Sequence, residues 1–369
     1  PPLQNDLWNV LVRMRFHPVL LSGDIRQAFL QVRIRKSDRD ALRFHWSPDA
    51  SSEVETLRFT TALFGLTSSP FLLGGVIDQH LTSWESRQPE IVAELRKSLY
   101  VDDLVSGKPT VEQAQVLKKG AVEVFNDATL TLHKWHSNKR ELEDTTINNE
   151  EKSFAKQQLG TPEEGASILG LSWSKDKDEI KVVVPKCRST KRGILSKLAQ
   201  IFDPLGLLSP RTLQGKLIYR EVCQKKLPWD APLSTKQNNQ WLKGEKQVPT
   251  ELAVPRSIPL FQENIESIAL HAFGDASGKG VGAVVYAVVN QESGTTQGIV
   301  AARARLAKQG LTIPRLELVS AYMACNLVDN VRNALSGFPV QHIYGWLDST
   351  VALHWIRGGG EHKSLLLIE

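Results

Sequence analysis

Short apolar runs separated by polar turns dominate the first 140 residues and predict a mixture of strands and helices. Residues 18–25 form an apolar run that contains one acid, Asp24. In residues 99–106, apolar side chains flank two adjacent acids, which is typical of a β-hairpin with a polar tip. Residues 129–136 alternate again as a strand. We therefore expect a small sheet that carries carboxylates close to its strand ends.

Helical spacing occurs between these strands. Residues 111–125 carry apolar side chains three or four positions apart, namely Ala114, Leu117, Ala121 and Val124. A second helix is expected to begin near Pro70, because proline is favoured in the first turn of a helix. A strand is expected at residues 57–59.

The second half of the chain shows a different order of elements. Residues 168–184 predict a hairpin, and residues 186–245 predict helices interrupted at Asp203-Pro204-Leu205-Gly206. The polar residues 141–165 are expected to form a loop or hinge. The three prolines within residues 246–266 suggest a linker. A second α/β pattern occupies the remainder of the chain.

Length and charge restrict the interpretation further. The chain has 369 residues, which suggests two or three domains, and its net charge is +5. Residues 181–226 hold eleven Lys or Arg against two acids, a local net charge of +9, which favours either a polyanionic partner or a solvated helical face. We find no apolar run long enough to span a bilayer and no signal peptide. Three widely spaced cysteines suggest a reducing environment.

The acids of the first half suggest metal chemistry. Two adjacent carboxylates, Asp102 and Asp103, repel each other, and a divalent cation would remove that penalty. The alternative is a solvated turn, because Asp is common in turns. Asp24 lies in an otherwise apolar strand and needs a partner. If this strand lies beside the hairpin, Asp24 and Asp102 would share the same metal ions.

Three motifs, in this order, resemble those in the palm of LTR-retrotransposon reverse transcriptases. The first is Asp24 with Phe29 five residues later, the second is Leu-Phe-Gly-Leu-Thr-Ser-Ser-Pro at 63–70, and the third is Tyr100-Val101-Asp102-Asp103. Residues 191–210 are similar to the segment that follows the palm in BEL/Pao-type retroelements. This resemblance extends over nearly the whole chain.

The resemblance implies a role for each matched residue. Asp24, Asp102 and Asp103 would be the catalytic carboxylates and metal ligands. Phe29 would act as a steric gate that selects deoxynucleotides, although an ordinary core phenylalanine is the alternative. Phe64 would contribute to substrate binding.

Three further positions would contact the substrate. Gly65 would allow close approach of the backbone to the nucleotide, or is a plain turn glycine. Tyr100 belongs to the same motif as the paired acids. Lys134 is a candidate ligand of the triphosphate, with Lys139 and Arg140 as competitors and a solvated lysine as the alternative.

A second set of acids resembles the site of a ribonuclease H. Asp275 and Asp348 each follow an apolar run, and Glu317 lies near the start of a helix that begins around Pro314. The resemblance assigns these three residues as metal ligands for cleavage of the RNA strand of a hybrid. Taken singly, each acid is also explained as a turn or helix-start residue. The family's fourth carboxylate has no counterpart after Asp348, and neither His354 nor His362 fits that position.

The resemblance implies an α/β (α+β) fold in three parts. Residues 1–145 would be a palm with an antiparallel sheet, helices and partial fingers. Residues 146–265 would be a basic, largely helical thumb or connection region that tracks a nucleic-acid backbone. Residues 266–369 would be a truncated ribonuclease H-like domain with a mixed sheet. We interpret the chain as a piece of a longer Pol polyprotein.

The implied activity is RNA-directed DNA synthesis with associated hybrid cleavage. The expected cofactor is Mg²⁺ or Mn²⁺, since oxygen ligands suit both. The expected partners are an RNA template, a DNA primer, an RNA–DNA hybrid and deoxynucleoside triphosphates, with no membrane, and the oligomeric state is left open. The implied location is a cytoplasmic virus-like particle, then the nucleus. The alternatives are a catalytically decayed nucleic-acid-binding relic and an RNA-templated RNA polymerase.

Overall fold

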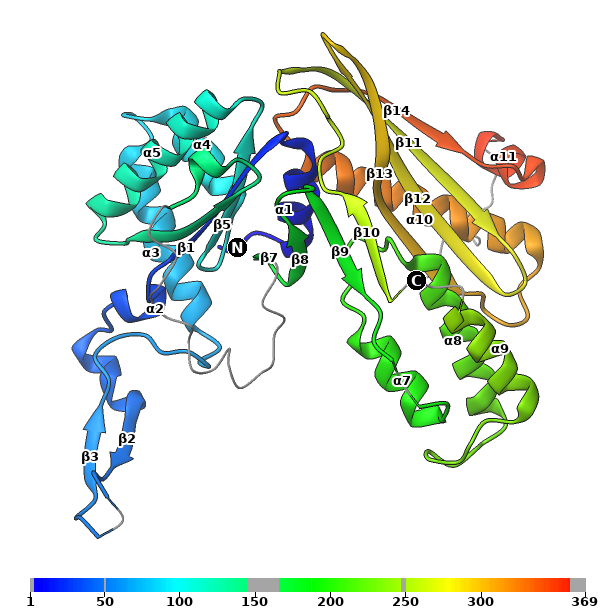
Figure 1. Cartoon of the computed structure of the whole chain (residues 1–369), viewed down its shortest axis with the longest axis horizontal. Coiled ribbons are helices and arrows are strands. Elements are labelled where there is room, and N and C mark those ends of the chain that lie inside the picture. Colours follow the sequence, from blue (N-terminus) through cyan, green and yellow to red (C-terminus); the bar gives the residue numbers. More distant parts are fainter. Residues whose placement is uncertain (1–2, 50, 145–165, 187, 247–249, 359–369) are drawn as a thin grey trace. The chain divides into compact units, whose positions relative to one another are not determined.

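The computed structural model describes residues 3–49, 51–144, 166–186, 188–246 and 250–358 (Figure 1). The chain divides into two compact units. The first comprises Pro1–Val10 and His17–Leu169, and the second comprises Leu11–Phe16 and Gly170–Glu369. Among the helices of the described residues, none is both long enough and apolar enough to cross a membrane.

The first unit contains a four-stranded antiparallel sheet in the order β4-β5-β1-β6. Its strands are β1 (Val19–Ile25), β4 (Leu99–Tyr100), β5 (Asp103–Lys108) and β6 (Leu132–Ser137). Its longer helices are α3 (Ser69–Trp84), α4 (Pro89–Ser98) and α5 (Val111–Asp127). These elements agree with the expected strands, hairpin and helices, and Pro70 does lie in the first turn of α3.

Smaller elements complete this unit. A hairpin of two short strands extends from the remainder of the unit (Figure 1). The shorter elements are α1 (Leu7–Arg13), which continues into the second unit, α2 (Ala28–Gln31), η2 (Lys36–Leu42), β2 (Arg43–Trp46), β3 (Glu55–Arg58), η3 (Arg140–Leu142) and β7 (Ala166–Ile168). Of the hinge expected at 141–165, residues 145–165 lie outside the described part of the chain.

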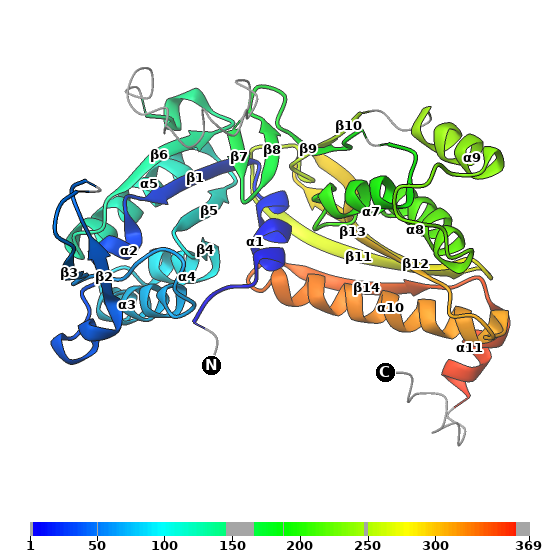
Figure 2. The ribbon, with the colours of Figure 1, turned by 90° about the horizontal axis from the view of Figure 1, so that it is seen from below.

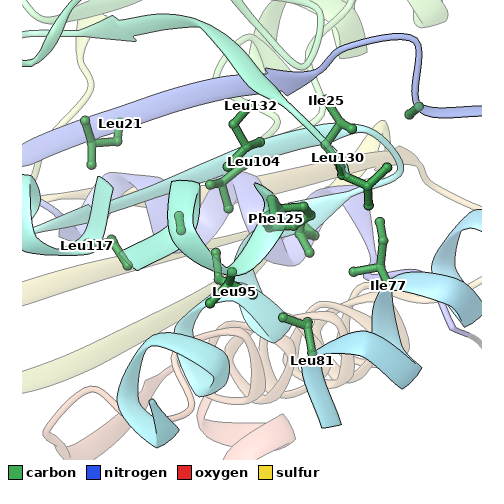
Figure 3. Close-up of a cluster of buried hydrophobic side chains, with 14 of the residues drawn as sticks. Leu21, Ile25, Ile77, Leu81, Leu95, Leu104, Leu117, Phe125, Leu130 and Leu132 are labelled. Atoms are coloured by element: carbon green, nitrogen blue, oxygen red, sulfur yellow. The ribbon is translucent and has the colours of Figure 1, made fainter. Parts of the chain in front are cut away.

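A hydrophobic core holds the sheet against its helices (Figure 3). Leu21, Ile25 and Leu104 face inward from the strands because alternate side chains of a strand share one face. The helices meet them with side chains at helical spacing, among them Ile77, Leu81, Leu117 and Phe125. Asp24 lies between two buried positions of β1 and is therefore directed to the opposite, more polar face.

The second unit begins with η1 (Met14–Phe16) and a small antiparallel sheet. Its strands are β8 (Leu171–Ser174), β9 (Glu179–Val183) and β10 (Glu251–Pro255). The expectation of a plain linker at 246–266 is therefore wrong in part, because β10 pairs along its whole length with β9. Proline is tolerated there because Pro255 ends an edge strand.

Buried arginines anchor this sheet. The Arg256 side chain is fully buried, and its Nε and NH2 groups donate to Asp178, each at 2.6 Å. Trp173 Nε1 donates to the same carboxylate at 2.9 Å. Arg15 lies close by and donates to the carbonyl oxygens of Pro255 and Arg256. Burial, followed by the charge of Arg256, lowers the pKa of Arg15 to about 10.

Three helices and a second sheet form the rest of the unit. The helices are α7 (Lys191–Gln200), α8 (Ser209–Gln224) and α9 (Thr235–Lys246). The sheet has the order β13-β12-β11-β14, with strands β11 (Ile265–Ala276), β12 (Gly280–Gln291), β13 (Gly294–Leu306) and β14 (Val340–Trp346). Strand β14 is parallel to β11, and the other pairs are antiparallel. Helix α10 (Ile313–Ala334) lies along one face of this sheet, and α11 (Thr350–Arg357) follows β14 (Figure 2).

The interruption predicted before α8 attaches the helical segment to this second sheet. Asp203 accepts hydrogen bonds from the amides of Leu207 and Leu208, which immediately precede α8. Leu205 accepts a hydrogen bond from Ala302 on β13. Gly206 has a φ of +73°, and a Cβ there would lie 1.8 Å from the Ala302 carbonyl oxygen. Only glycine fits this close approach.

Candidate active site

Parallel strands bring two acids of the second unit to the same end of the sheet. Strand β11 pairs with β14 so that Phe273 lies opposite Trp346. Asp275 and Asp348 each follow that pair by two residues. The two acids are thus 73 residues apart in sequence but close together at one end of the sheet.

Helix α10 supplies the third acid. Glu317 lies in the second turn of this helix, whose buried face packs on β11 and β12. One carboxylate oxygen from each of Asp275, Glu317 and Asp348 lies within 4.8 Å of the others. Within the residues that the structure describes, this is the only group of three or more acids, His or Cys with that geometry.

The electrostatics of the triad are unfavourable for the protein alone. Glu317 is only 6% exposed, and its Oε2 atom has no hydrogen-bond partner among the described residues. Burial raises the pKa of the Glu317 carboxyl, and the charges of Asp348 and Asp275 raise it further. Asp275 and Asp348 are exposed, so the opening of the site is accessible to solvent.

Such a site fits a divalent cation. The donor set consists of carboxylate oxygens, the ligands preferred by Mg²⁺ and Mn²⁺. A cation would provide the missing partner of Glu317 Oε2 and offset the repulsion among three like charges. The three acids that the sequence singled out are therefore brought together as a candidate metal centre.

In the first unit, the sheet register places the other acids side by side. Asp24 on β1 is directly opposite Asp103 on β5, and directly paired residues of two strands share one face. The amide of Ile25 donates to the Asp102 carbonyl oxygen at 2.9 Å. Partial burial raises the pKa of Asp102, and the charge of Asp24 adds to that rise. Asp24 and the hairpin acids therefore lie at one end of the sheet in the first unit.

These three acids are less tightly assembled than the triad. They do not form a compact ligand group like that of Asp275, Glu317 and Asp348. Instead, Asp24 Oδ2 lies 3.1 Å from His133 Nε2 and 3.9 Å from Lys134 Nζ.

Sequence reasoning placed Lys134 near the substrate but missed His133. His133 is directly opposite Asp24 on the neighbouring strand β6. The alternation of residues 129–136 predicted a strand, but nothing local indicated that this strand would pair with β1. Its partner lies 109 residues away in the sequence.

The remaining predicted substrate contacts lie near this end of the sheet and on the loop before α3. Phe29 is 7% exposed and packs edge to face against Phe64, with 4.9 Å between ring centroids. Phe64 is 65% exposed. Gly65 has a φ of +86° with open space where a Cβ would lie. Tyr100 on β4 pairs with Asp103.

The basic stretch at 181–226 is mostly, but not wholly, a surface feature. Its lysines and arginines lie on β9, α7, α8 and the segments around them. Lys197 is the exception, since it is 8% exposed on the inner side of α7. The interpretation of this segment as a solvated charged face therefore does not account for Lys197.

Comparison with known proteins shows that part of the second unit is similar to one family. Residues 190–349 match the family described as "Pao retrotransposon-like RNaseH-like domain". This part of the chain is thus similar to the RNase H-like domains of that family, and it contains all three acids of the triad. No curated protein sequence is significantly similar to the chain.

Solved structures confirm the fold over almost the whole chain. A foamy viral protease-reverse transcriptase in complex with an RNA/DNA hybrid matches with a TM-score of 0.52 and 16% identity, covering 95% of this chain and 42% of that one. A foamy viral protease-reverse transcriptase dRH in complex with double-stranded DNA matches with a TM-score of 0.57 and 15% identity, covering 95% and 54%. The chain therefore spans about half the length of these structures. The mixed α/β fold with antiparallel sheets resembles the fold of these two structures, as expected.

Proposed function

We propose that this chain is the reverse transcriptase and ribonuclease H portion of a BEL/Pao-type Pol polyprotein. The observation that carries the proposal is the convergence of Asp275, Glu317 and Asp348 within an RNase H-like fold. Support for the polymerase half comes from Asp24 beside Asp102 and Asp103, in a unit whose fold is shared with reverse transcriptases.

Each residue has a stated task in this proposal. Bound Mg²⁺ or Mn²⁺ would activate the attacking oxygen and neutralise the charge that develops on the phosphate. Asp275, Glu317 and Asp348 would hold the cations for cleavage of the RNA strand. Asp24 and Asp102, with Asp103 next to them, would do so for DNA synthesis.

Further residues of the first unit would select and orient the nucleotide. Phe29, held in place by Phe64, would exclude a ribose 2′-hydroxyl through its ring. Lys134 lies beside Asp24 and would pair with the triphosphate. Gly65 and Tyr100 would contact the nucleotide or the template. The proposed substrates are deoxynucleoside triphosphates on an RNA template with a DNA primer, and then the hybrid product.

The nucleic acid would be held mainly by charge. The neighbouring structures are described with an RNA/DNA hybrid and with double-stranded DNA. We propose residues 146–265 as the thumb or connection region, between a palm at 1–145 and a nuclease domain at 266–369. The excess of lysine and arginine at 181–226 would contact phosphates without reading sequence.

A pair of substitutions separates the two activities. Asp102→Asn should abolish Mg²⁺-dependent primer extension on an RNA template and leave cleavage of a labelled RNA–DNA hybrid in place. Glu317→Gln should do the reverse. Asp38→Asn and Glu266→Gln are matched controls, because both residues are exposed and lie outside the acid clusters. Primer extension at the normal rate by Asp102→Asn would disprove the polymerase assignment.

The alternative function is binding without catalysis. A decayed relic would bind hybrid in a salt-sensitive manner but would neither extend a primer nor cleave RNA. Incorporation of ribonucleotides in preference to deoxynucleotides would instead favour an RNA-templated RNA polymerase.

A further inference from the structure

Strand β6 lies beside β1 and brings two side chains to the Asp24 carboxylate (Figure 2). His133 Nε2 lies 3.1 Å from Asp24 Oδ2, and Lys134 Nζ lies 3.9 Å from the same oxygen. A carboxylate oxygen can only accept, so the proton of the shorter contact is on His133 Nε2. No described residue donates a hydrogen bond to Asp24 Oδ1. One oxygen is thus held by the protein, and the other is available to a cation.

A β-bulge explains how two consecutive residues of β6 reach one carboxylate. Adjacent side chains of a regular strand point to opposite faces of the sheet. The register between β1 and β6 shifts just before Asp24, so that Gly23 lies opposite two residues, Lys134 and Trp135, instead of one. Lys134 has a φ of +53°, in the left-handed region. As a result, His133 and Lys134 both lie outside the core, whereas Trp135 is buried.

Gly23 makes room for this bulge on the opposite strand. A Cβ at Gly23 would lie 3.1 Å from the Trp135 ring, which is tighter than an ordinary van der Waals contact. A larger side chain would push against the indole and therefore against the bulged segment of β6. The residue just before Asp24 thus helps to keep the partners of Asp24 in place.

The neighbours of Asp24 on the other side give this contact a purpose. Asp24 lies directly opposite Asp103, and the charges of Asp24 and Asp102 act on each other. Repulsion among these carboxylates favours orientations of the Asp24 side chain that keep the oxygens apart. The hydrogen bond from His133 selects one orientation before any cation binds. Donors that orient a metal-ligating carboxylate in this way typically change metal affinity or activity by roughly 10- to 100-fold when they are removed.

We propose that His133 is a positioning residue for DNA synthesis. Its Nε2–H holds Asp24 Oδ2, so that Asp24 Oδ1 is presented to a divalent cation. This inference rests on the proposed polymerase function. His133 contacts neither the nucleotide nor the reacting atoms in this role, and the neighbouring Lys134 keeps the separate task of pairing with the triphosphate.

Selective ¹⁵N labelling of the histidines tests the contact itself by NMR spectroscopy, without any catalysis. The His133 ring signal is the one that disappears in His133→Gln. We expect Asp24→Asn to shift this signal and Asp38→Asn, the exposed control, to leave it unchanged. A His133 signal that does not respond to Asp24→Asn overturns the proposal.

Mn²⁺ binding, followed by EPR spectroscopy, tests the effect of the contact on the cation. Glu317→Gln is the background, because it removes the buried ligand of the other acid cluster. Binding that Asp24→Asn abolishes is assigned to the site of interest. In this background, His133→Leu should weaken that binding by roughly 10-fold or more, and His133→Gln, which keeps an N–H donor of similar reach, should restore most of it. Equal binding by His133→Leu overturns the proposal, and so does tighter binding, because His133 would then compete with the cation.

Primer extension separates positioning from substrate binding. His133→Leu should lower kcat by roughly 10- to 100-fold with little change in the KM for the deoxynucleotide, whereas Lys134→Met should chiefly raise that KM. His133→Gln should recover most of kcat, which a merely structural loss would not allow. His136→Leu is the matched control on β6, since His136 lies opposite Ser22 rather than an acid.

The outcomes distinguish this inference from the function on which it rests. Primer extension by the parent protein together with a normal kcat in His133→Leu overturns the positioning role and leaves the polymerase assignment intact. A parent protein that shows the His133–Asp24 contact, but neither binds Mn²⁺ through Asp24 nor extends a primer, overturns the polymerase assignment and the positioning role with it.

Discussion

Replacing Glu317 by glutamine tests whether the triad is a metal site without relying on activity. In the metal-free protein, three carboxylates lie within 4.8 Å of one another, and one of them is buried. Two unit charges at that distance repel by roughly 3 kcal/mol at an effective dielectric constant near 20. Asp275 and Asp348 are exposed, so solvent screens much of this repulsion. Glutamine keeps the size of the side chain and removes the charge.

We therefore expect Glu317→Gln to stabilise the metal-free second unit by about 1–2 kcal/mol near pH 7. Saturating Mg²⁺ should reverse the order. A cation present at 100 times its dissociation constant stabilises a folded protein by about 2.7 kcal/mol, and the variant should lose most of this gain. The stability of the variant thus exceeds that of the parent protein in EDTA and falls below it in Mg²⁺.

The pH dependence has a defined sign. The folded pKa of Glu317 is raised above the ordinary value of a glutamate, so the folded state binds this proton more tightly than the unfolded state does. Stability of the metal-free protein should then fall as pH rises from about 4.5 through the folded pKa. The variant should lack this part of the decline.

Hydrogen exchange of peptides from β11 and α10 measures the effect where it arises. Exchange reports the free energy of opening for a chosen region, which avoids assuming that two compact units unfold together. Glu266→Gln, on the exposed side of β11, is the matched control and should change little in either condition. Equal protection of parent and variant by Mg²⁺ would refute the metal assignment, and a less stable variant in EDTA would refute the repulsion argument.

Three further predictions concern stability and selectivity. Asp178→Asn removes the carboxylate that pairs with the buried Arg256 and should cost about 3–5 kcal/mol in urea unfolding. Gly206→Ala forces a Cβ towards the Ala302 carbonyl at a positive φ, so we expect a loss of roughly 2–4 kcal/mol in the same assay; wild-type stability would contradict the close approach. Phe29→Val should raise ribonucleotide incorporation relative to deoxynucleotide incorporation in primer extension, with a stability loss of about 1–3 kcal/mol from the emptied space. An unchanged ratio of incorporation would remove Phe29 from the role of gate.

Sequence patterns predicted most helices and strands because the turn residues and apolar spacing that define these elements lie within a few residues of one another. The hairpin at 99–106 and the helix at 111–125 follow from turn acids and apolar spacing within a few residues, and the structure has both. Strand β10 was missed because prolines around 251–255 resemble a linker, and only its pairing with β9 makes it a strand. Whether a polar residue such as Lys197 is buried also depends on helices far away in sequence.

The same distinction separates the two acid clusters. Asp275 and Asp348 are positioned by the ends of two parallel strands, so backbone register alone brings them together. Glu317 then needs only the packing of α10 on that sheet. Asp24, by contrast, is placed by its strand, but its side chain is oriented by a contact with His133 that belongs to β6. The sequence can therefore indicate which residues carry the carboxylates of both sites. The direction of the Asp24 carboxylate, by contrast, depends on the assembled sheet.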